Sequence, residues 1–509
     1  MPLPPITALF LTHFDDIKGQ SVTFYESASP NVLPEEGIEH KTLPSGLHTL
    51  TSDLILCTHH GLPCVGVFRS RERQDGGGRG RAMGTLGIVL APRSSVEALF
   101  EVQDVLSDLY DQLEALPGSV FDTDDKSSVK ELLRTTWESS RLESFSGERF
   151  GPLPGTEQVR RFVEGKASSS KHHPSSYLPV LLETLGPSIV TVYKTALNGG
   201  RILLYSPPPL GPVGAFAWCI WAMSLAPSAA SDADISQWLG NVGLMDLDEV
   251  KRTQGGWIAT TSDAIYKSHP SAYDIYIDLS ASHYSESSTS SRPSAPVYAS
   301  QPNVQSDPKL VTYAFSDLPL YRSLLLLSSS PSNVTVGQTL SKSGGLWLVA
   351  FELLEKVWRL CVGVCEFAVG RGSVGDIRLE AGEENDPLFG EYDESPPEIG
   401  TLANLGNIAA EGSDYNDDGA EGDGLSTDVG EEESIRRGRL VLRQFHHQSY
   451  HFYRRLKQLR RGDGGDGLTE AELRELCGTS RWTIWGGDPG STVEGKWWTA
   501  LARRWGITA

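Results

Sequence analysis

One stretch near the end of the chain has the residue types of a phosphate-binding loop. The run Gly490-Ser-Thr-Val-Glu-Gly495-Lys496 has the required glycine and lysine spacing. Such a loop also needs Ser or Thr directly after the lysine, because that hydroxyl holds magnesium, and this sequence has Trp497 there. We therefore interpret the match as coincidence and expect no nucleotide site.

Two groups of cysteine and histidine have spacings that could suit a metal. One group flanks a predicted tight turn, and the other joins two cysteines one helical turn apart to a later histidine cluster. Neither contains the paired Cys-x-x-Cys of a structural zinc site. We favour buried core thiols, keep metal as the alternative, and predict no metal and no cofactor. The groups are Cys57, His59, His60 and Cys64, and Cys361, Cys365, His446, His447 and His451.

The sequence has no recognisable catalytic motif. It contains neither a Gly-x-Ser-x-Gly nucleophile elbow nor a His-Glu-x-x-His zinc motif. We therefore predict no catalytic residue and leave an enzyme activity as an open alternative. The feature expected of an enzyme would be a deep pocket with convergent polar groups.

The negative charge of the chain is concentrated in one segment. The formal net charge is −21, and the range 376–433 holds 19 Asp or Glu and one basic residue, Arg378, which leaves −18 in that segment. We predict a disordered acidic insert there, rich in Gly, Asp and Glu with few large apolar residues. A broad nucleic-acid-binding face is unfavourable, since such a face needs clustered Lys and Arg.

A basic run follows directly. The range Arg436 to Arg461 has nine Lys or Arg, no acid and several interleaved aromatic residues. Three interpretations stay open. In the first, the run is the solvated face of a core helix. In the second, it contacts an anionic membrane at the periphery, or nucleic acid. In the third, the acidic insert lies against it, and salt weakens that contact.

Two observations bear on the compartment. The range Met1 to Phe14 has no basic segment, and its apolar stretch is too short for a secretory signal. The longest apolar run, Val213 to Ala226, is about 14 residues, whereas a membrane span needs about 20. We predict a cytoplasmic protein with reduced thiols, with peripheral contact to endomembranes as the membrane alternative.

The elements before residue 120 predict an antiparallel sheet with a long helix across it. Strand-like apolar runs separated by turns indicate five strands, and leucines recurring every three or four residues indicate the helix. The expected strands are 6–15, 20–27, 52–59, 63–70 and 82–91, and the expected helix is 96–116. The range 121–174 is expected to be a linker with one helix near 128–139.

After Ser175 the pattern changes to an α/β layer, with helices alternating with short apolar strands. The apolar stretch Ile202 to Tyr205 predicts a central strand buried on both faces, which the three following prolines terminate. The range Val213 to Leu225 predicts a helix enclosed on every side. Further strands are expected at 243–250, 255–262 and 273–280, then a Ser/Pro-rich linker at 286–307, then a helical module at 308–375 and 434–509.

Several of these stretches together resemble a known family. The N-terminal pattern consists of Ile38 to Lys41, Ser45 to His48, Ser52-Asp53, Arg79 to Arg81 and Gly87-Ile88. The run LNGGRILLYSPPPLGPVG, residues 197–214, is similar to a strand of the same family that ends on Ser-Pro-Pro-Pro. The chain thus resembles the tripartite DENN-domain proteins, specifically the LCHN-type branch, over about 5–120 and 175–285 and more loosely beyond.

The resemblance implies a longin-like lobe at 1–120, a central α/β DENN lobe at 175–285 and a helical tail. It also implies a guanine nucleotide exchange factor for a Rab-type small GTPase in membrane traffic. In this hypothesis the two lobes hold the nucleotide-free GTPase between them, so a fused core would contradict it. A non-catalytic adaptor is the alternative. The candidate GTPase-facing residues are Ser52, Asp53, Ser206, Pro207 and Gly211.

Overall fold

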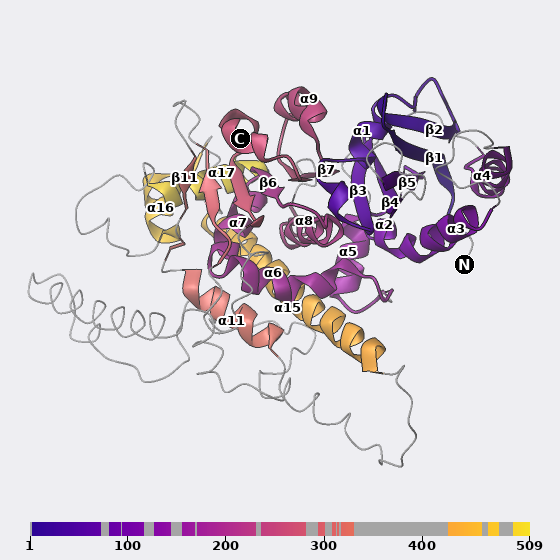
Figure 1. Ribbon diagram of the computed structural model, residues 1–509. Coiled ribbons are helices and arrows are strands. Elements are labelled where there is room, and N and C mark those ends of the chain that lie inside the picture. Colours follow the sequence, from indigo (N-terminus) through magenta and orange to yellow (C-terminus); the bar gives the residue numbers. More distant parts are fainter. Residues whose placement is uncertain are drawn as a thin grey trace, which may run out of the picture. The chain divides into compact units, whose positions relative to one another are not determined.

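The protein has a mixed α/β fold, as predicted. The computed structural model describes residues 3–72, 81–92, 94–116, 127–143, 155–167, 170–230, 236–280, 294–300, 308–311, 313–314, 317–329, 426–460, 467–477 and 492–508. Within these ranges the strands form a single sheet, whose order is β11-β10-β9-β6-β8-β7-β3-β4-β5-β1-β2 (Figure 1).

The first lobe contributes the antiparallel part of this sheet, and its five strands lie where the apolar runs separated by turns predict them. Every neighbouring pair within the lobe is antiparallel, with β1 between β2 and β5 and with β4 between β5 and β3. The bounds are β1 Ile6–Asp15, β2 Gly19–Ser27, β3 Ser52–His59, β4 Leu62–Glu72 and β5 Arg81–Leu90.

The long helix predicted over 96–116 is two helices, α2 (Ala98–Glu101) and α3 (Gln103–Glu114), with Val102 between them. The leucines of α3 recur at three and four residues and are buried in the core, which explains the helical face. The helix expected near 128–139 is confirmed as α4 (Ser127–Ser140). Short helices that we did not predict are α1 (Ile38–Thr42), η1 (Leu47–Thr49) and α5 (Thr156–Val163).

The central lobe contributes parallel strands. Strand β6 lies between β8 and β9, and its middle residues are buried, which confirms the prediction of a central strand. It ends at Tyr205, immediately before the prolines. The bounds are β6 Arg201–Tyr205, β7 Gln237–Asn241, β8 Trp257–Thr261 and β9 Ile275–Asp278.

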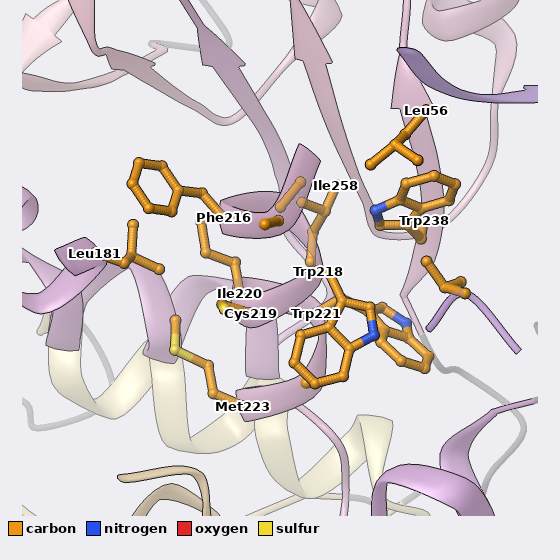
Figure 2. Close-up of a cluster of buried hydrophobic side chains, with 14 of the residues drawn as sticks. Leu56, Leu181, Phe216, Trp218, Cys219, Ile220, Trp221, Met223, Trp238 and Ile258 are labelled. Carbon is orange, nitrogen blue, oxygen red and sulfur yellow. The ribbon is translucent and has the colours of Figure 1, made fainter. Parts of the chain in front are cut away.

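The helices around these strands include the predicted enclosed one. Every residue of α8 (Gly211–Met223) from Val213 onward is buried, so the segment is apolar on all sides (Figure 2). Helix α7 ends where Gly199 adopts a positive φ, as the Asn-Gly-Gly sequence predicts. The other elements are η2 Pro174–Tyr177, α6 Leu178–Leu185, α7 Ser188–Leu197, η5 Ala264–Ser268 and η6 Pro270–Ala272.

Two predictions for this lobe are wrong. The range 243–250 is not a strand but forms η4 (Leu244–Asp246) and α9 (Leu247–Arg252), because the Asp246 carboxylate accepts a bond from the Gly243 amide at 2.9 Å and closes the turn. The 286–307 segment is not only a linker. It contains β10 (Val297–Ala299), which pairs antiparallel with the free edge of β9 and with β11 (Lys309–Leu310).

The two lobes are fused. Strand β3 pairs with β7 at Cys57 and Gly240, so the sheet continues from one lobe into the other. Leu56 of β3 lies beside Trp238 of β7 in the same hydrophobic core as Trp218 of α8 (Figure 2). The expectation of an open groove between separate lobes is therefore wrong at this position.

Helices complete the described chain: α11 Leu318–Ser328, α15 Ser426–Leu459, α16 Glu470–Leu476 and α17 Val493–Arg504. Helix α15 starts inside the predicted disordered insert, so that prediction is wrong for 426–433, where Glu433 forms ion pairs with Arg436 and Arg437 of the next turn. The rest of the insert, and the cysteines Cys361 and Cys365, lie outside the described residues. In the part of the chain that the structure describes, no helix is both long and apolar enough to cross a membrane.

Candidate functional site

The side chain of Asp53 joins the two lobes. Its Oδ2 accepts a hydrogen bond from the Leu210 amide at 2.7 Å, and its Oδ1 accepts one from the Gly211 amide at 3.1 Å. These amides begin α8 and have no partner within the helix, and the helix dipole also favours a carboxylate at this end. Burial raises the pKa of Asp53, and the three amide donors from Leu210, Gly211 and Leu54 limit that rise.

Two glycines allow the backbones of the lobes to come this close. A Cβ atom on Gly214 of α8 would lie 2.5 Å from Leu56 Cδ1, and one on Gly240 of β7 would lie 2.6 Å from the Leu56 carbonyl oxygen. Gly240 also has a φ of 65°, which a side chain would strain. The close packing of β3 against α8 and β7 therefore depends on these two positions.

A buried cation joins the lobes near the other end of β3. The ammonium group of Lys41 in α1 lies 3.3 Å from Asp246 Oδ1 of η4 and donates to the Thr58 carbonyl oxygen at 3.1 Å. The Thr58 hydroxyl donates in turn to the Leu239 carbonyl oxygen at 3.3 Å. The sequence marked Lys41 as part of the family pattern but did not assign it this contact.

The proline loop after β6 is packed on the first lobe. The side chain of Ser206 is buried, and its hydroxyl donates to the Pro207 carbonyl oxygen at 2.8 Å. The Pro208 ring lies against Gly46, where a Cβ would be 3.1 Å from Pro208 Cδ. The bond between Pro208 and Pro209 is cis. The loop at the carboxyl end of β6 thus belongs to the region where the two lobes are in contact. We call this region, which includes Lys41, Asp53, Gly211 and Gly240, the joint.

A cavity of about 370 Å³ opens beside the joint, between β3, β4 and α3. Ser52 and Asp53 line it, whereas the other candidates Ser206, Pro207 and Gly211 are not among its lining residues. The structure thus brings Asp53 and Gly211 into contact and places Ser52 at the cavity. The lining residues are Ser52, Asp53, Leu54, Val67, Arg69, Arg71, Gln103, Ser107 and Asp111.

The cavity wall is polar and charge-balanced. Arg69 donates to Glu114 at 2.9 Å and to the Ser107 carbonyl oxygen at 3.1 Å, and it also pairs with Asp111. Arg71 donates to Glu114 at 2.8 Å and is half exposed. Neither arginine was predicted from the sequence. Such a wall can recognise a polar partner group by hydrogen bonds and charge, with Arg71 the more accessible cation.

The cysteine and histidine groups that we considered as metal sites contribute to the protein core, in the part of them that the structure describes. The thiols of Cys57 and Cys64 are buried in a hydrophobic cluster, as predicted. His59 is not solvated but buried, with Nε2 2.8 Å from the Pro34 carbonyl oxygen, and burial lowers its pKa to about 4. The described residues contain no group of three or more His, Cys, Asp or Glu that could hold a metal.

The segment that resembles a phosphate-binding loop is described from Thr492 onward, where it forms the start of α17. The Thr492 hydroxyl accepts a hydrogen bond from the Gly495 amide at 2.9 Å and so caps α17. Trp497, in the position that a magnesium-binding hydroxyl would need, donates from Nε1 to the Lys194 carbonyl oxygen at 3.0 Å. These contacts support the interpretation of the match as coincidence.

Comparison with known proteins identifies the class. A family model described as DENN domain-containing protein 11 matches residues 9–289, which include both lobes and the joint. The chain therefore belongs to the DENN domain-containing protein 11 family of DENN-domain proteins.

The curated relatives are distant in sequence. The Xenopus laevis DENN domain-containing protein 11 is 26% identical over 293 residues, which cover 54% of this chain and 62% of the relative. The Danio rerio protein of the same name is 22% identical over 278 residues, or 54% and 53% of the two chains. An uncharacterised Saccharomyces cerevisiae protein is 25% identical over 310 residues, or 56% and 60%. The match thus spans less than two thirds of each of these relatives.

Proposed function

We propose that this protein is a cytoplasmic guanine nucleotide exchange factor for a Rab-type small GTPase in membrane traffic. Membership in the DENN domain-containing protein 11 family is the observation that carries the proposal. The geometry adds a reason for the family pattern, because Lys41, Asp53 and the prolines after β6 fix the two lobes to one another. These contacts keep the surface of the first lobe and the surface of the central lobe in a fixed relative orientation beside the joint.

The fused sheet changes the mechanism that we expected. Lobes that share a sheet between β3 and β7 are not two separate halves that prise a GTPase open. The mechanism we propose instead is binding to a preformed surface at the joint, with the polar cavity lined by Ser52, Asp53 and Arg71 as one contact. Exchange then follows if this surface binds the nucleotide-free GTPase more tightly than the GDP-bound form.

Nucleotide release across a panel of Rab proteins, loaded with a fluorescent GDP analogue, tests the proposal. We expect the protein to accelerate release from at least one member. Ser52→Trp, which places a large ring at the cavity, should reduce that acceleration without lowering the melting temperature, because Ser52 is exposed. Lys130→Trp on α4 is the matched control, an exposed position of another helix. A panel without any accelerated member would contradict the exchange function.

The fused joint also favours a second candidate, a non-catalytic adaptor that binds a GTPase or another trafficking partner through the same surface. The two candidates differ in the nucleotide state that they prefer. An exchange factor should capture the nucleotide-free GTPase best in a pull-down, whereas an adaptor should capture the GDP-bound or GTP-bound form at least as well.

The proposal includes the predicted contact of the basic run from Arg436 to Arg461 with an anionic membrane. Such a contact would place the protein on the surface where membrane traffic takes place. It requires that basic side chains of the run remain available on the outside of the folded protein.

A further inference from the structure

The basic run forms most of α15, and one face of this helix packs against the central lobe. Phe445 and Leu456 are fully buried on that face. The His446 ring lies with Nε2 2.8 Å from the Ala222 carbonyl oxygen, and the Tyr453 hydroxyl donates to the Ala229 carbonyl oxygen at 2.7 Å. One side of this helix is therefore buried in the core. This agrees with the interpretation of the basic run as the solvated face of a core helix.

Six of the nine cations of the run have contacts within the described part of the protein. Arg436 pairs with Glu433 at 2.7 Å, and the Lys457 ammonium lies 5.2 Å from the centre of the Tyr453 ring. Arg437 pairs with Glu433 at 3.0 Å, and the Arg439 guanidinium lies 4.6 Å from the centre of the Phe162 ring. Arg455 and Arg460 donate to backbone carbonyl oxygens, at Glu475 and Ile507. These contacts use part of the basic charge within the protein, so the count of basic residues in the sequence overstates the charge available to a partner.

Four exposed side chains of the run form a stripe on the outer face. Arg443, Tyr450, Arg454 and Lys457 are all exposed, and Tyr450 keeps 52% of its surface accessible. Their spacings of seven, four and three residues place them on one side of the helix. Among the described residues, neither Arg443 nor Arg454 forms an ion pair with an acidic side chain. We call these four residues the outer stripe.

We propose that the outer stripe of α15 docks on an anionic membrane surface. The proposal deepens the membrane contact given above, and it rests on that part of the proposed function. Guanidinium and ammonium groups are attracted to anionic lipid headgroups, and the amphipathic tyrosine ring suits the interface between water and acyl chains. A single line of side chains along a helix is enough to contact a plane.

Nucleic acid is the less favoured partner. Affinity for a duplex comes from many phosphate contacts by clustered Lys and Arg, and the stripe offers three such cations separated along one helix. An exposed tyrosine between the cations adds apolar contact that a lipid interface uses directly.

Flotation of the full-length protein with vesicles tests the inference. We expect binding to vesicles of phosphatidylcholine with phosphatidylserine, little binding to phosphatidylcholine alone, and loss of binding as salt is raised. R443A/R454A should weaken binding about 25-fold, at about fivefold for each cation near an anionic surface. Tyr450→Ala should weaken it further. The matched control K130A/K251A removes two exposed cations from α4 and α9 and should bind like the unmodified protein.

Several outcomes would overturn the inference. These are equal binding to neutral vesicles, equal losses in R443A/R454A and its control, or binding of the same stripe to duplex nucleic acid in place of vesicles. Nucleotide release measured without vesicles separates this inference from the exchange function. If R443A/R454A keeps that activity but loses the vesicles, the stripe acts as proposed. If the unmodified protein binds vesicles and accelerates no GTPase, the exchange function fails and the membrane contact stands.

Discussion

The Asp53 carboxylate in β3 accepts a hydrogen bond from the amide of Gly211, the first residue of α8, at 3.1 Å across a sequence separation of 158 residues. The same carboxylate accepts from Leu210 at 2.7 Å. One side chain of the first lobe thus supplies the missing acceptors for the start of the most buried helix of the central lobe. This bond connects the start of β3 to the segment that follows the proline loop after β6.

Replacement of Asp53 should loosen the joint. Asp53→Ala leaves two helix-start amides without an acceptor, and we expect a loss of about 3 kcal/mol in the free energy of unfolding. Asp53→Asn keeps one acceptor oxygen and should cost less. Urea unfolding measures both variants, with Ser52→Ala as the neighbouring control, for which a change within about 0.5 kcal/mol is expected. An Asp53→Ala protein as stable as Ser52→Ala would refute the role of this bond.

Gly240 can be compared with another glycine of similar backbone geometry. Gly240 and Gly255 have φ values of 65° and 80°, so alanine strains both. A Cβ on Gly240 would lie 2.6 Å from the Leu56 carbonyl oxygen, whereas one on Gly255 would meet nothing within 4 Å. We expect Gly255→Ala to cost about 1 kcal/mol and Gly240→Ala about 3 kcal/mol or more, from strain and overpacking together. Equal losses in thermal or urea unfolding would show that the contact between β3 and β7 is not tight.

The carboxyl group of Glu97, just before α2, should make stability depend on pH. Its side chain is 6% exposed, beside Ser95, Glu101 and Trp218, and burial raises its pKa to about 7. The folded state therefore holds this proton more tightly than the unfolded state does. The resulting stabilisation is complete below the unfolded pKa of about 4.5 and is lost as pH rises towards 7, by about 3 kcal/mol in total.

Glu97→Gln removes this titration, so the variant should gain stability relative to the unmodified protein as pH is raised from about 5 to about 8. Urea unfolding at the two pH values measures the difference. Glu138→Gln, at an exposed position of α4, is the matched control and should follow the unmodified protein. If Glu97→Gln and Glu138→Gln show the same pH dependence, the buried carboxyl group is not the source.

The ion pair of Lys41 and Asp246 suits a double-mutant cycle. Both side chains are largely buried, so removal of the ammonium group leaves an unpaired carboxylate, and Lys41→Met should cost about 3 kcal/mol. Asp246→Asn keeps an acceptor for the Gly243 amide but loses the charge. We expect the double variant K41M/D246N to lose less than the sum of the two single losses. Additive losses would show that the two groups do not interact.

Local patterns were enough to predict much of the fold. The strands from Ile6 to Leu90 are apolar runs separated by turns, and the segment from Val213 to Met223 has no polar face, so both could be assigned from the sequence. The stretch 243–250 was misassigned because its spaced apolar residues were taken for a strand. The acids at Asp248 and Glu249 and the bases at Lys251 and Arg252 suit the two ends of a helix and were the better signal.

The joint could not be predicted in this way. Strand β7 has a glycine at positive φ and an irregular register between Trp238 and Gly240, which hides its alternation. The contacts of Asp53 with Gly211 and of Lys41 with Asp246 connect residues that no local pattern relates. Arg439, Arg455 and Arg460 contact an aromatic ring or backbone carbonyl oxygens of other elements, which only the packing of α15 reveals.

The meeting of β3 and β7 at Cys57 and Gly240 has a mechanical consequence. This register is one residue pair long, whereas β6 and β8 are in register along their whole length from Arg201 to Tyr205. A pulling force applied between the first lobe and α15 would load that short ladder together with the side-chain bonds around it. Rupture should begin at this seam and release two intact halves before either one unravels.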